Sequence, residues 1–259
     1  MTDRYCPTPA EVLAIKPKDG YLKLSGDGIF ATRQGEGATA GMNAIFIRLH
    51  FCNLACGLGG GWVCDTEFTW KKGLKEFWQE PTDMTPLEIA NQVGRSWSEA
   101  FGNTNDRRIV ITGGEPLLQQ RKIVGLIGLL PDWAIEIETN GTISPVAELS
   151  NCQFNCSPKL ANSGNSLARR FHPDVLRRIA LLSNSWFKFV VTKESDLDEI
   201  DQVAKECSLP NNRILIMPEG RDAQRIASQA DLLSDEVLRR GYTTTLRNQL
   251  IWFGDTRGT

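Results

Sequence analysis

Short apolar segments alternate with longer amphipathic stretches along most of the chain, and this alternation constrains the fold more than any other feature. It is typical of a parallel sheet whose strands are joined by crossover helices. The predicted strands are residues 44–50, 108–112, 134–138, 154–157, 186–191 and 213–217; the predicted helices are residues 85–100, 116–130, 196–207 and 223–240. About six such units predict an α/β protein with an incomplete (β/α)6 barrel, in which ligands gather at the carboxyl ends of the strands.

The composition predicts one domain with a sizeable core. The chain has 259 residues, of which 41% are hydrophobic and 23% charged, and its formal net charge is −2. A pI of about 5.8 provides no general basic surface for nucleic acid, so we expect a small-molecule substrate. The N-terminus lacks a signal pattern and no apolar run reaches about 18 residues. We therefore expect a cytoplasmic protein without a membrane partner.

Three cysteines, Cys52, Cys56 and Cys64, lie within thirteen residues directly after the predicted strand 44–50. Three soft thiolates on one glycine-rich loop indicate a metal centre. An iron–sulfur cube held by three cysteines keeps one iron open for a further ligand, which favours catalysis over electron storage. Two alternatives are a disulfide with a spare thiol, and a zinc site completed by Asp65 or His50.

The other four cysteines are Cys6, Cys152, Cys156 and Cys207. Seven is an odd number, and an oxygen-sensitive cluster needs a reducing compartment, so we expect these four to be free thiols. The spacing of Cys152 and Cys156 is also compatible with a second metal. Because no further cysteine lies nearby, two thiols in the core are the favoured interpretation.

A second motif, Gly113-Gly114-Glu115-Pro116, follows the predicted strand 108–112. Paired glycines at the end of a strand let a ligand approach the backbone closely. Pro116 suits the first turn of a helix, and Glu115 places a carboxylate at the mouth of the site, where it could accept from an ammonium group. Together with the three-cysteine loop, the motif resembles the radical S-adenosylmethionine superfamily, in which a Gly-Gly-Glu segment receives the methionyl amino group of the cofactor.

Further motifs narrow the resemblance to one family. They are Phe30-Ala-Thr-Arg33-Gln34-Gly35-Glu36-Gly37, Phe46-Ile-Arg48-Leu49, Cys64-Asp65-Thr66, Ile137-Glu-Thr-Asn-Gly141 and Ser157-Pro158-Lys159. In this order they resemble the 7-carboxy-7-deazaguanine synthases of queuosine-type deazapurine biosynthesis. The resemblance implies a TIM-like barrel of the radical S-adenosylmethionine type as a single domain at residues 29–259. Residues 1–28 would then form an N-terminal extension, such as an appended strand or hairpin.

The resemblance implies a carbon–nitrogen lyase that converts 6-carboxy-5,6,7,8-tetrahydropterin to 7-carboxy-7-deazaguanine with loss of ammonia. It implies three cofactors, namely a 4Fe-4S cluster on the three cysteines, S-adenosylmethionine, and Mg2+ at Thr66, whose hard hydroxyl oxygen suits a hard cation. The cluster and S-adenosylmethionine would carry the radical chemistry, so no side chain is assigned as catalytic. The family also implies an electron donor such as flavodoxin or ferredoxin, and a homodimer.

The resemblance also implies two sets of binding residues. Arg48 has planar donors that suit a substrate carboxylate, and Glu36 could accept two hydrogen bonds from the guanidine-like edge of the pterin. The predicted substrate-binding residues are Arg33, Gln34, Gly35, Glu36, Arg48 and Thr112. The predicted S-adenosylmethionine-binding residues are Gly114, Glu115, Ser157, Pro158, Lys159, Pro218 and Glu219. Residues 138–141 fit either a ribose site or an Asx-type turn.

The sequence departs from the family pattern at two points. Seven residues separate Cys56 from Cys64, where the superfamily usually has two, and we interpret this expanded loop as tolerated variation. Gln249 occupies a position near the C-terminus where many relatives have histidine, which puts the lining of the substrate pocket in question. Two other functions remain as alternatives, namely a glycyl-radical-enzyme activase and a non-enzymatic zinc or iron–sulfur module.

Overall fold

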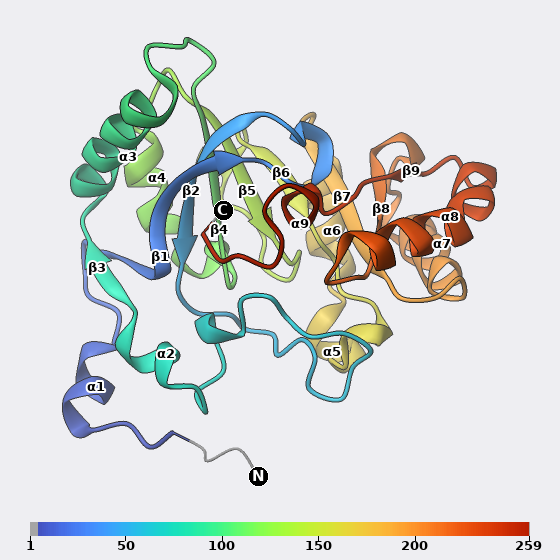
Figure 1. Ribbon diagram of the computed structural model, residues 1–259, viewed down its shortest axis with the longest axis horizontal. Coiled ribbons are helices and arrows are strands. Elements are labelled where there is room, and N and C mark those ends of the chain that lie inside the picture. Colours follow the sequence, from blue (N-terminus) through green and yellow to red (C-terminus); the bar gives the residue numbers. More distant parts are fainter. Residues whose placement is uncertain (1–4, 259) are drawn as a thin grey trace.

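The computed structural model describes residues 5–258, and its centre is a curved nine-stranded sheet (Figure 1). The strand order is β3-β1-β2-β4-β5-β6-β7-β8-β9. Six successive strands run parallel, namely β2 (Asn43–Leu49), β4 (Arg108–Gly113), β5 (Ala134–Thr139), β6 (Gln153–Cys156), β7 (Ser185–Val191) and β8 (Ile214–Pro218). The short β9 (Thr243–Thr244) extends the sheet beyond β8. Because β3 and β9 do not pair with each other, the sheet stays open, and the predicted incomplete barrel is confirmed.

An antiparallel edge precedes the parallel strands, of which the sequence predicted only an appended strand or hairpin within residues 1–28. It consists of β1 (Leu22–Arg33), which pairs with β2, and β3 (Thr82–Met84), which pairs with β1. The predicted limit of the N-terminal extension, residue 28, falls inside β1. The β1–β2 ladder continues on both sides of that position, interrupted by an irregularity between Leu24 and Ile29. Residues 22–33 therefore form one element, and the division at residue 28 stays a prediction.

Helices cover the outer face of the sheet (Figure 1). The main ones are α3 (Pro86–Phe101), α4 (Gln120–Ile127), α6 (Pro173–Ala180), α7 (Asp196–Cys207) and α8 (Ala223–Arg239). Four shorter helices are α1 (Pro9–Ala14), α2 (Lys75–Gln79), α5 (Leu167–Arg170) and α9 (Asn248–Phe253). α3 begins as expected, because Thr85 and Glu88 form a reciprocal capping box. The predicted helix at 116–130 instead begins as a 3-10 turn, Pro116–Gln119, in which the Glu115 carboxylate accepts from the Leu117 N–H.

Alternate residues of each parallel strand face the helices or the interior of the curved sheet. On β2 and β4, Ile45, Ile47, Ile109 and Ile111 join the main core under the helices. Their neighbours Phe46 and Val110 form a small second cluster with Ala44 on the opposite face. The same alternation places the next residues toward the carboxyl ends, Arg48 and Thr112, on that inner face. The parallel register therefore directs polar side chains from several strands into one interior space.

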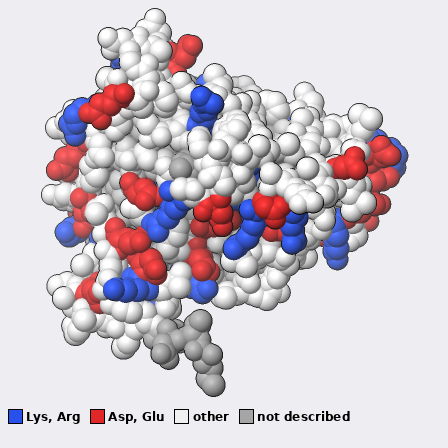
Figure 2. Space-filling model, in the orientation of Figure 1, with Lys and Arg blue, Asp and Glu red and all other residues white. Residues whose placement is uncertain are grey.

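Charge is mixed on the surface. On the face that Figure 2 shows, Lys and Arg side chains lie beside Asp and Glu side chains. None of the helices within residues 5–258 is both long and apolar enough to cross a membrane.

Candidate active site

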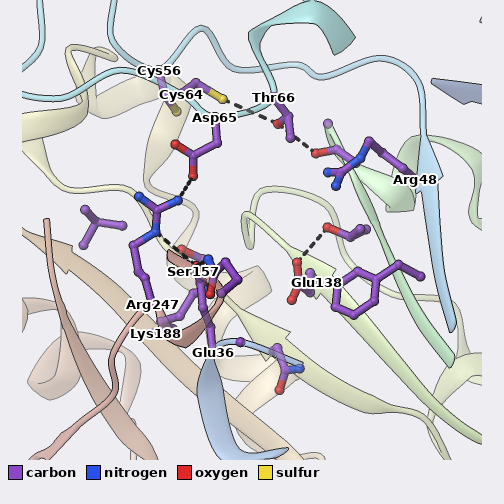
Figure 3. A pocket seen from close by; sticks show the side chains of 18 of the residues that line it. Glu36, Arg48, Cys56, Cys64, Asp65, Thr66, Glu138, Ser157, Lys188 and Arg247 are labelled. Atoms are coloured by element: carbon purple, nitrogen blue, oxygen red, sulfur yellow. Dashed lines mark hydrogen bonds and ion pairs between the residues drawn. The ribbon is translucent and has the colours of Figure 1, made fainter. Parts of the chain in front are cut away.

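A cavity of about 360 Å³ lies on the inner face of the sheet, at the carboxyl ends of the strands. Figure 3 shows side chains from several strands and from the loop after β2 converging on it. It brings together most of the predicted site residues, namely Arg33, Gln34, Gly35, Glu36, Arg48, Cys52, Cys56, Cys64, Thr66, Thr112, Gly114, Ser157 and Lys159. Four predicted residues do not line it: Glu115, Pro158, Pro218 and Glu219.

Arg48 presents a cation to the cavity without a bonded carboxylate. Its Nε is buried without a hydrogen-bond partner, and its guanidinium carbon lies 5.3 Å from the centre of the Phe30 ring. Burial lowers the pKa of Arg48, because the charged form loses hydration. Among residues 5–258, no carboxylate forms an ion pair with it. A half-buried cation whose Nε is buried without a partner is well suited to an anionic ligand.

Glu138 lies on the same wall of the cavity as Arg48, with Thr112 on the strand between them (Figure 3). Its Oε2 accepts from the Thr112 hydroxyl at 2.7 Å, and its Oε1 accepts from the Gln34 side-chain amide at 3.2 Å. Each carboxylate oxygen has further lone pairs, so Glu138 can also accept from a ligand. Arg48, Thr112, Gln34 and Glu138 thus combine one unpaired cation with several hydrogen-bonding groups on one wall.

Glu36 is already engaged by three side chains. Its carboxylate pairs with Lys188 and with Arg247, and it accepts from the Gln249 amide at 2.6 Å. Burial by itself would raise the pKa of Glu36, but the two cations outweigh it and lower the pKa to about 2. Three protein donors therefore share its two oxygens, and the contact with the guanidine-like edge of the pterin stays a prediction.

The C-terminal segment closes this side of the cavity. The Asn248 N–H donates to the Gly35 carbonyl at 3.0 Å, and the Gly37 N–H donates to the Thr245 hydroxyl at 2.9 Å. A β-carbon at Gly35 would lie 2.0 Å from the Gln249 Oε1, so glycine permits this contact. Gln249 thus replaces the expected histidine with an amide that donates to Glu36.

The three cysteines line the cavity on the loop that follows β2. The loop begins with Phe51 at φ 79°, a left-handed conformation that is strained for a residue with a β-carbon. All three thiols are free, which contradicts the disulfide alternative. Burial raises the pKa of the Cys52 thiol to about 12 and also raises that of Cys56, so metal binding must displace their protons.

Within residues 5–258, no three His, Cys, Asp or Glu side chains are arranged to hold a single metal ion. A cube binds each cysteine through a different iron, and its ligands stand farther apart than those of one zinc ion. Cys52, Cys56 and Cys64 all line the same cavity. His50, a ligand in the zinc alternative, does not line the cavity; its ring lies between Phe51 and Phe77.

The Gly113-Gly114 pair is required by close contact, with the Leu49 backbone for Gly113 and with the cysteine loop for Gly114. A β-carbon at Gly114 would lie 2.1 Å from the Phe51 carbonyl oxygen and 2.9 Å from the Cys52 β-carbon. The Glu115 carboxylate faces inward, fully buried, instead of the cavity mouth. It accepts from three donors, namely the N–H groups of Leu117 and Asn140 and the Thr139 hydroxyl. The carboxylate thus joins the segment after β4 to the end of β5, and the contact with an ammonium group stays a prediction.

Ser157 and Lys159 stand on the wall nearest the cysteine loop. The Lys159 ammonium donates to the Ser157 hydroxyl at 2.8 Å and lies 5.9 Å from the centre of the Trp62 ring. Glu219, expected in the same site, instead pairs with Arg225 at 2.9 Å. In residues 138–141 the Asn140 side chain accepts from the Thr142 N–H at 3.0 Å, as an Asx-type turn requires.

Thr66 lies between the cysteine loop and the paired glycines. Its hydroxyl donates to the Gly113 carbonyl at 3.2 Å, which keeps its oxygen lone pairs available at the cavity wall. The neighbouring Asp65 pairs with Arg247 (Figure 3). A hydroxyl oxygen at this position fits a hard cation such as Mg2+.

Cys152 and Cys156, whose spacing is also compatible with a second metal, are buried free thiols, as expected. Both belong to the main core, at the start and end of the β6 region.

Three cavity residues escaped the sequence analysis: Glu138 as a ligand, Lys188 and Arg247. Lys188 could have been recognised from the sequence, because it is the one charged residue of the mainly apolar strand β7. Arg247 could not, because its role depends on the C-terminal segment returning to residues that precede it by 211 positions.

Comparisons with known proteins agree with this geometry. No protein-family model matches the chain. A 7-carboxy-7-deazaguanine synthase of Rhodopirellula baltica is 31% identical over 269 residues, covering 97% of this chain and 96% of the relative. One of Pyrobaculum aerophilum is 30% identical over 234 residues, covering 89% and 95%. The crystal structure of QueE from Escherichia coli superposes with a TM-score of 0.65 at 24% identity, covering 87% of this chain and 94% of that one.

The open sheet has the same fold as QueE from Escherichia coli, and the cysteine-lined cavity lies at its carboxyl edge. The sequence identity of 30% and 31% to the two synthases, over 89% and 97% of this chain, defines the family more closely. The chain belongs to the 7-carboxy-7-deazaguanine synthases, and the family predicted from its motifs is confirmed.

Proposed function

We propose that the protein converts 6-carboxy-5,6,7,8-tetrahydropterin to 7-carboxy-7-deazaguanine with loss of ammonia. The observation that carries the proposal is Arg48, a half-buried cation without a carboxylate partner in the same cavity as the three cysteines. A substrate with one carboxylate and a flat polar ring matches that arrangement. The guanidinium would pair with the carboxylate, and Glu138 would accept from donors on the ring.

The cofactors would bind at the part of the cavity that the three cysteines line. Cys52, Cys56 and Cys64 would hold the 4Fe-4S cluster, and Ser157 and Lys159 would contact S-adenosylmethionine beside it. When bound, the reduced cluster and S-adenosylmethionine supply a 5′-deoxyadenosyl radical that removes a hydrogen atom from the substrate.

The remaining residues would orient the substrate and exclude water. Thr66 would hold Mg2+ with a hydroxyl oxygen, and the metal would bind substrate oxygens. Lys188 and Arg247 fix Glu36 as a charged carboxylate, so that the Gln34–Glu36 loop keeps its shape beside the pterin. The C-terminal segment closes the cavity over these groups.

The test is turnover by the reconstituted protein. Native protein is loaded anaerobically with iron and sulfide, then given dithionite, S-adenosylmethionine, Mg2+ and the carboxytetrahydropterin, and the products are identified by mass spectrometry. We expect 5′-deoxyadenosine and 7-carboxy-7-deazaguanine. In Arg48→Gln, we expect the cluster to remain and deazaguanine formation to fall. Deoxyadenosine without deazaguanine from the native protein would refute the substrate, and failure to bind a cluster would refute the whole assignment.

We further propose a cytoplasmic homodimer reduced by a flavodoxin or ferredoxin. Exposed leucines on α8, Leu232 and Leu238, offer apolar area for a second copy of the chain. Light scattering of the reconstituted protein tests the dimer. Replacing dithionite with a reduced flavodoxin or ferredoxin tests the electron donor, and loss of all turnover with both would contradict it.

A further inference from the structure

A buried asparagine, Asn165, points its side-chain amide at a cysteine of the predicted cluster. Its Nδ2 lies 3.3 Å from the Cys56 Sγ, and the residue is 8% exposed. Its Oδ1 accepts from the Ala55 N–H at 3.0 Å. Because a backbone N–H needs an acceptor, this second contact fixes the orientation of the amide, and the NH2 group must face the sulfur.

The turn that carries Asn165 is joined tightly to the expanded cysteine loop. The N–H groups of Gly57 and Gly61 donate to the carbonyls of Ser163 and Asn162 at 2.9 Å and 2.7 Å. A β-carbon at Gly164, where φ is 77°, would lie 2.6 Å from the Leu58 carbonyl oxygen. The glycines of the expanded loop are therefore matched to this turn, and their contact holds Asn165 beside Cys56.

A second amide provides a comparison. The Asn140 Nδ2 lies 3.9 Å from the Cys52 Sγ, but it donates to the Asn53 Oδ1 at the shorter distance of 2.9 Å. The amide that has the shorter contact to a cysteine sulfur is that of Asn165.

We propose that Asn165 is a positioning residue that donates a hydrogen bond to the Cys56 thiolate and raises the reduction potential of the cluster. Reduction adds negative charge to the cube and its thiolates, and a donor stabilises the more negative state. The expanded loop has a defined role in this arrangement, because its contacts with residues 162–164 deliver the donor. This inference rests on the proposed cluster, although not on the identity of the substrate.

The test is the midpoint potential of the reconstituted cluster, followed by EPR during a redox titration. Asn165→Asp keeps the acceptor for Ala55 and replaces the donor with a charged oxygen. Asn165→Ala removes both groups. We expect lower potentials in both variants, with the lower value in Asn165→Asp. At a fixed reductant potential below the native midpoint, the ratio of reduced to oxidised cluster in that variant should fall about tenfold, which is about 59 mV for one electron.

The matched control is Asn162→Ala. Asn162 belongs to the same turn and also anchors the loop, because it accepts from the Trp62 ring N–H at 3.0 Å and donates to Asp196 at 2.8 Å. Its amide does not bond to a cysteine sulfur. If Asn165 served the loop only as an anchor, all three variants would lose iron without a common change in potential. We expect an altered potential at position 165 alone.

The outcomes separate this inference from the proposed function. Native protein that binds no cluster refutes the proposed function itself. Native and variant proteins with full iron content and equal potentials refute the role of Asn165. Should the variants lose the cluster, native protein with 15N-amide asparagine decides: pulsed EPR of its reduced cluster should detect a coupled amide nitrogen, and its absence would overturn the proposal.

Discussion

Removing Lys188 should destabilise the protein through Glu36. The pKa of Glu36 is lowered from its ordinary value of 4.5 to about 2, in spite of burial, which opposes the charge. At about 1.4 kcal/mol per pKa unit, the cations stabilise the carboxylate by about 3 kcal/mol more than the protonated acid. Lys188 is the largest of the favourable causes. Lys188→Met should therefore remove part of this stabilisation at pH 7, on the order of 1–3 kcal/mol, because Arg247 and Gln249 still hold the carboxylate.

The stability difference between native protein and Lys188→Met should depend on pH. The folded-state pKa of Glu36 is depressed, so its contribution is fully present above pH 4.5 and is lost as the pH falls toward 2. The difference between native protein and Lys188→Met should accordingly be largest at pH 7 and shrink below pH 4.5. Lost packing of the lysine side chain would instead give a difference that does not depend on pH.

The assay is urea unfolding of the metal-free proteins, followed by tryptophan fluorescence between pH 7 and pH 3. Lys193→Met is the control, since this lysine is exposed and lies two residues after β7 ends. It should have native stability throughout. An equal loss for Lys188→Met at pH 7 and pH 3, or no loss at pH 7, would refute the argument that Lys188 acts by holding the Glu36 charge.

Three further changes test the site. Cys56→Ala should abolish both iron binding and S-adenosylmethionine cleavage, with an unchanged circular dichroism spectrum. Cys6→Ala, the control at an exposed thiol, should keep both activities. A fully active Cys56→Ala would exclude the cluster assignment. Thr66→Ala should keep the cluster but raise the Mg2+ concentration needed for turnover, and Thr66→Ser should restore it; an unchanged Mg2+ response would remove Thr66 from the site. Arg48→Gln should raise the KM for the carboxytetrahydropterin about ten- to a hundredfold, the value of a charge-assisted hydrogen bond, while S-adenosylmethionine still binds; an unchanged KM would contradict the carboxylate contact.

Local patterns in the sequence were sufficient to predict the parallel strands and the helices between them. The six parallel strands lie close to their predicted positions, because apolar strands and capped helices are specified by neighbouring residues. Alternation along β2 and β4 then decides that Arg48 and Thr112 face the cavity while Ile47 and Ile111 face the helices. The paired glycines Gly113 and Gly114 could also be recognised in the sequence, although the structure requires them because they contact Leu49 and Phe51 closely.

The contacts that buried polar side chains make with distant parts of the chain could not be predicted from the sequence. The motif around Glu36 suggested a free carboxylate, yet its partners Lys188 and Arg247 come from positions 152 and 211 residues away. Glu115 was predicted at the mouth, and the tertiary structure turns it inward to three donors. Asn165 belongs to no motif and gains its meaning from a contact with Cys56, 109 residues earlier. Short-range sterics and the burial of apolar faces can be inferred along the chain, whereas the partner of a buried polar group is decided only when distant segments meet and leave it no access to water.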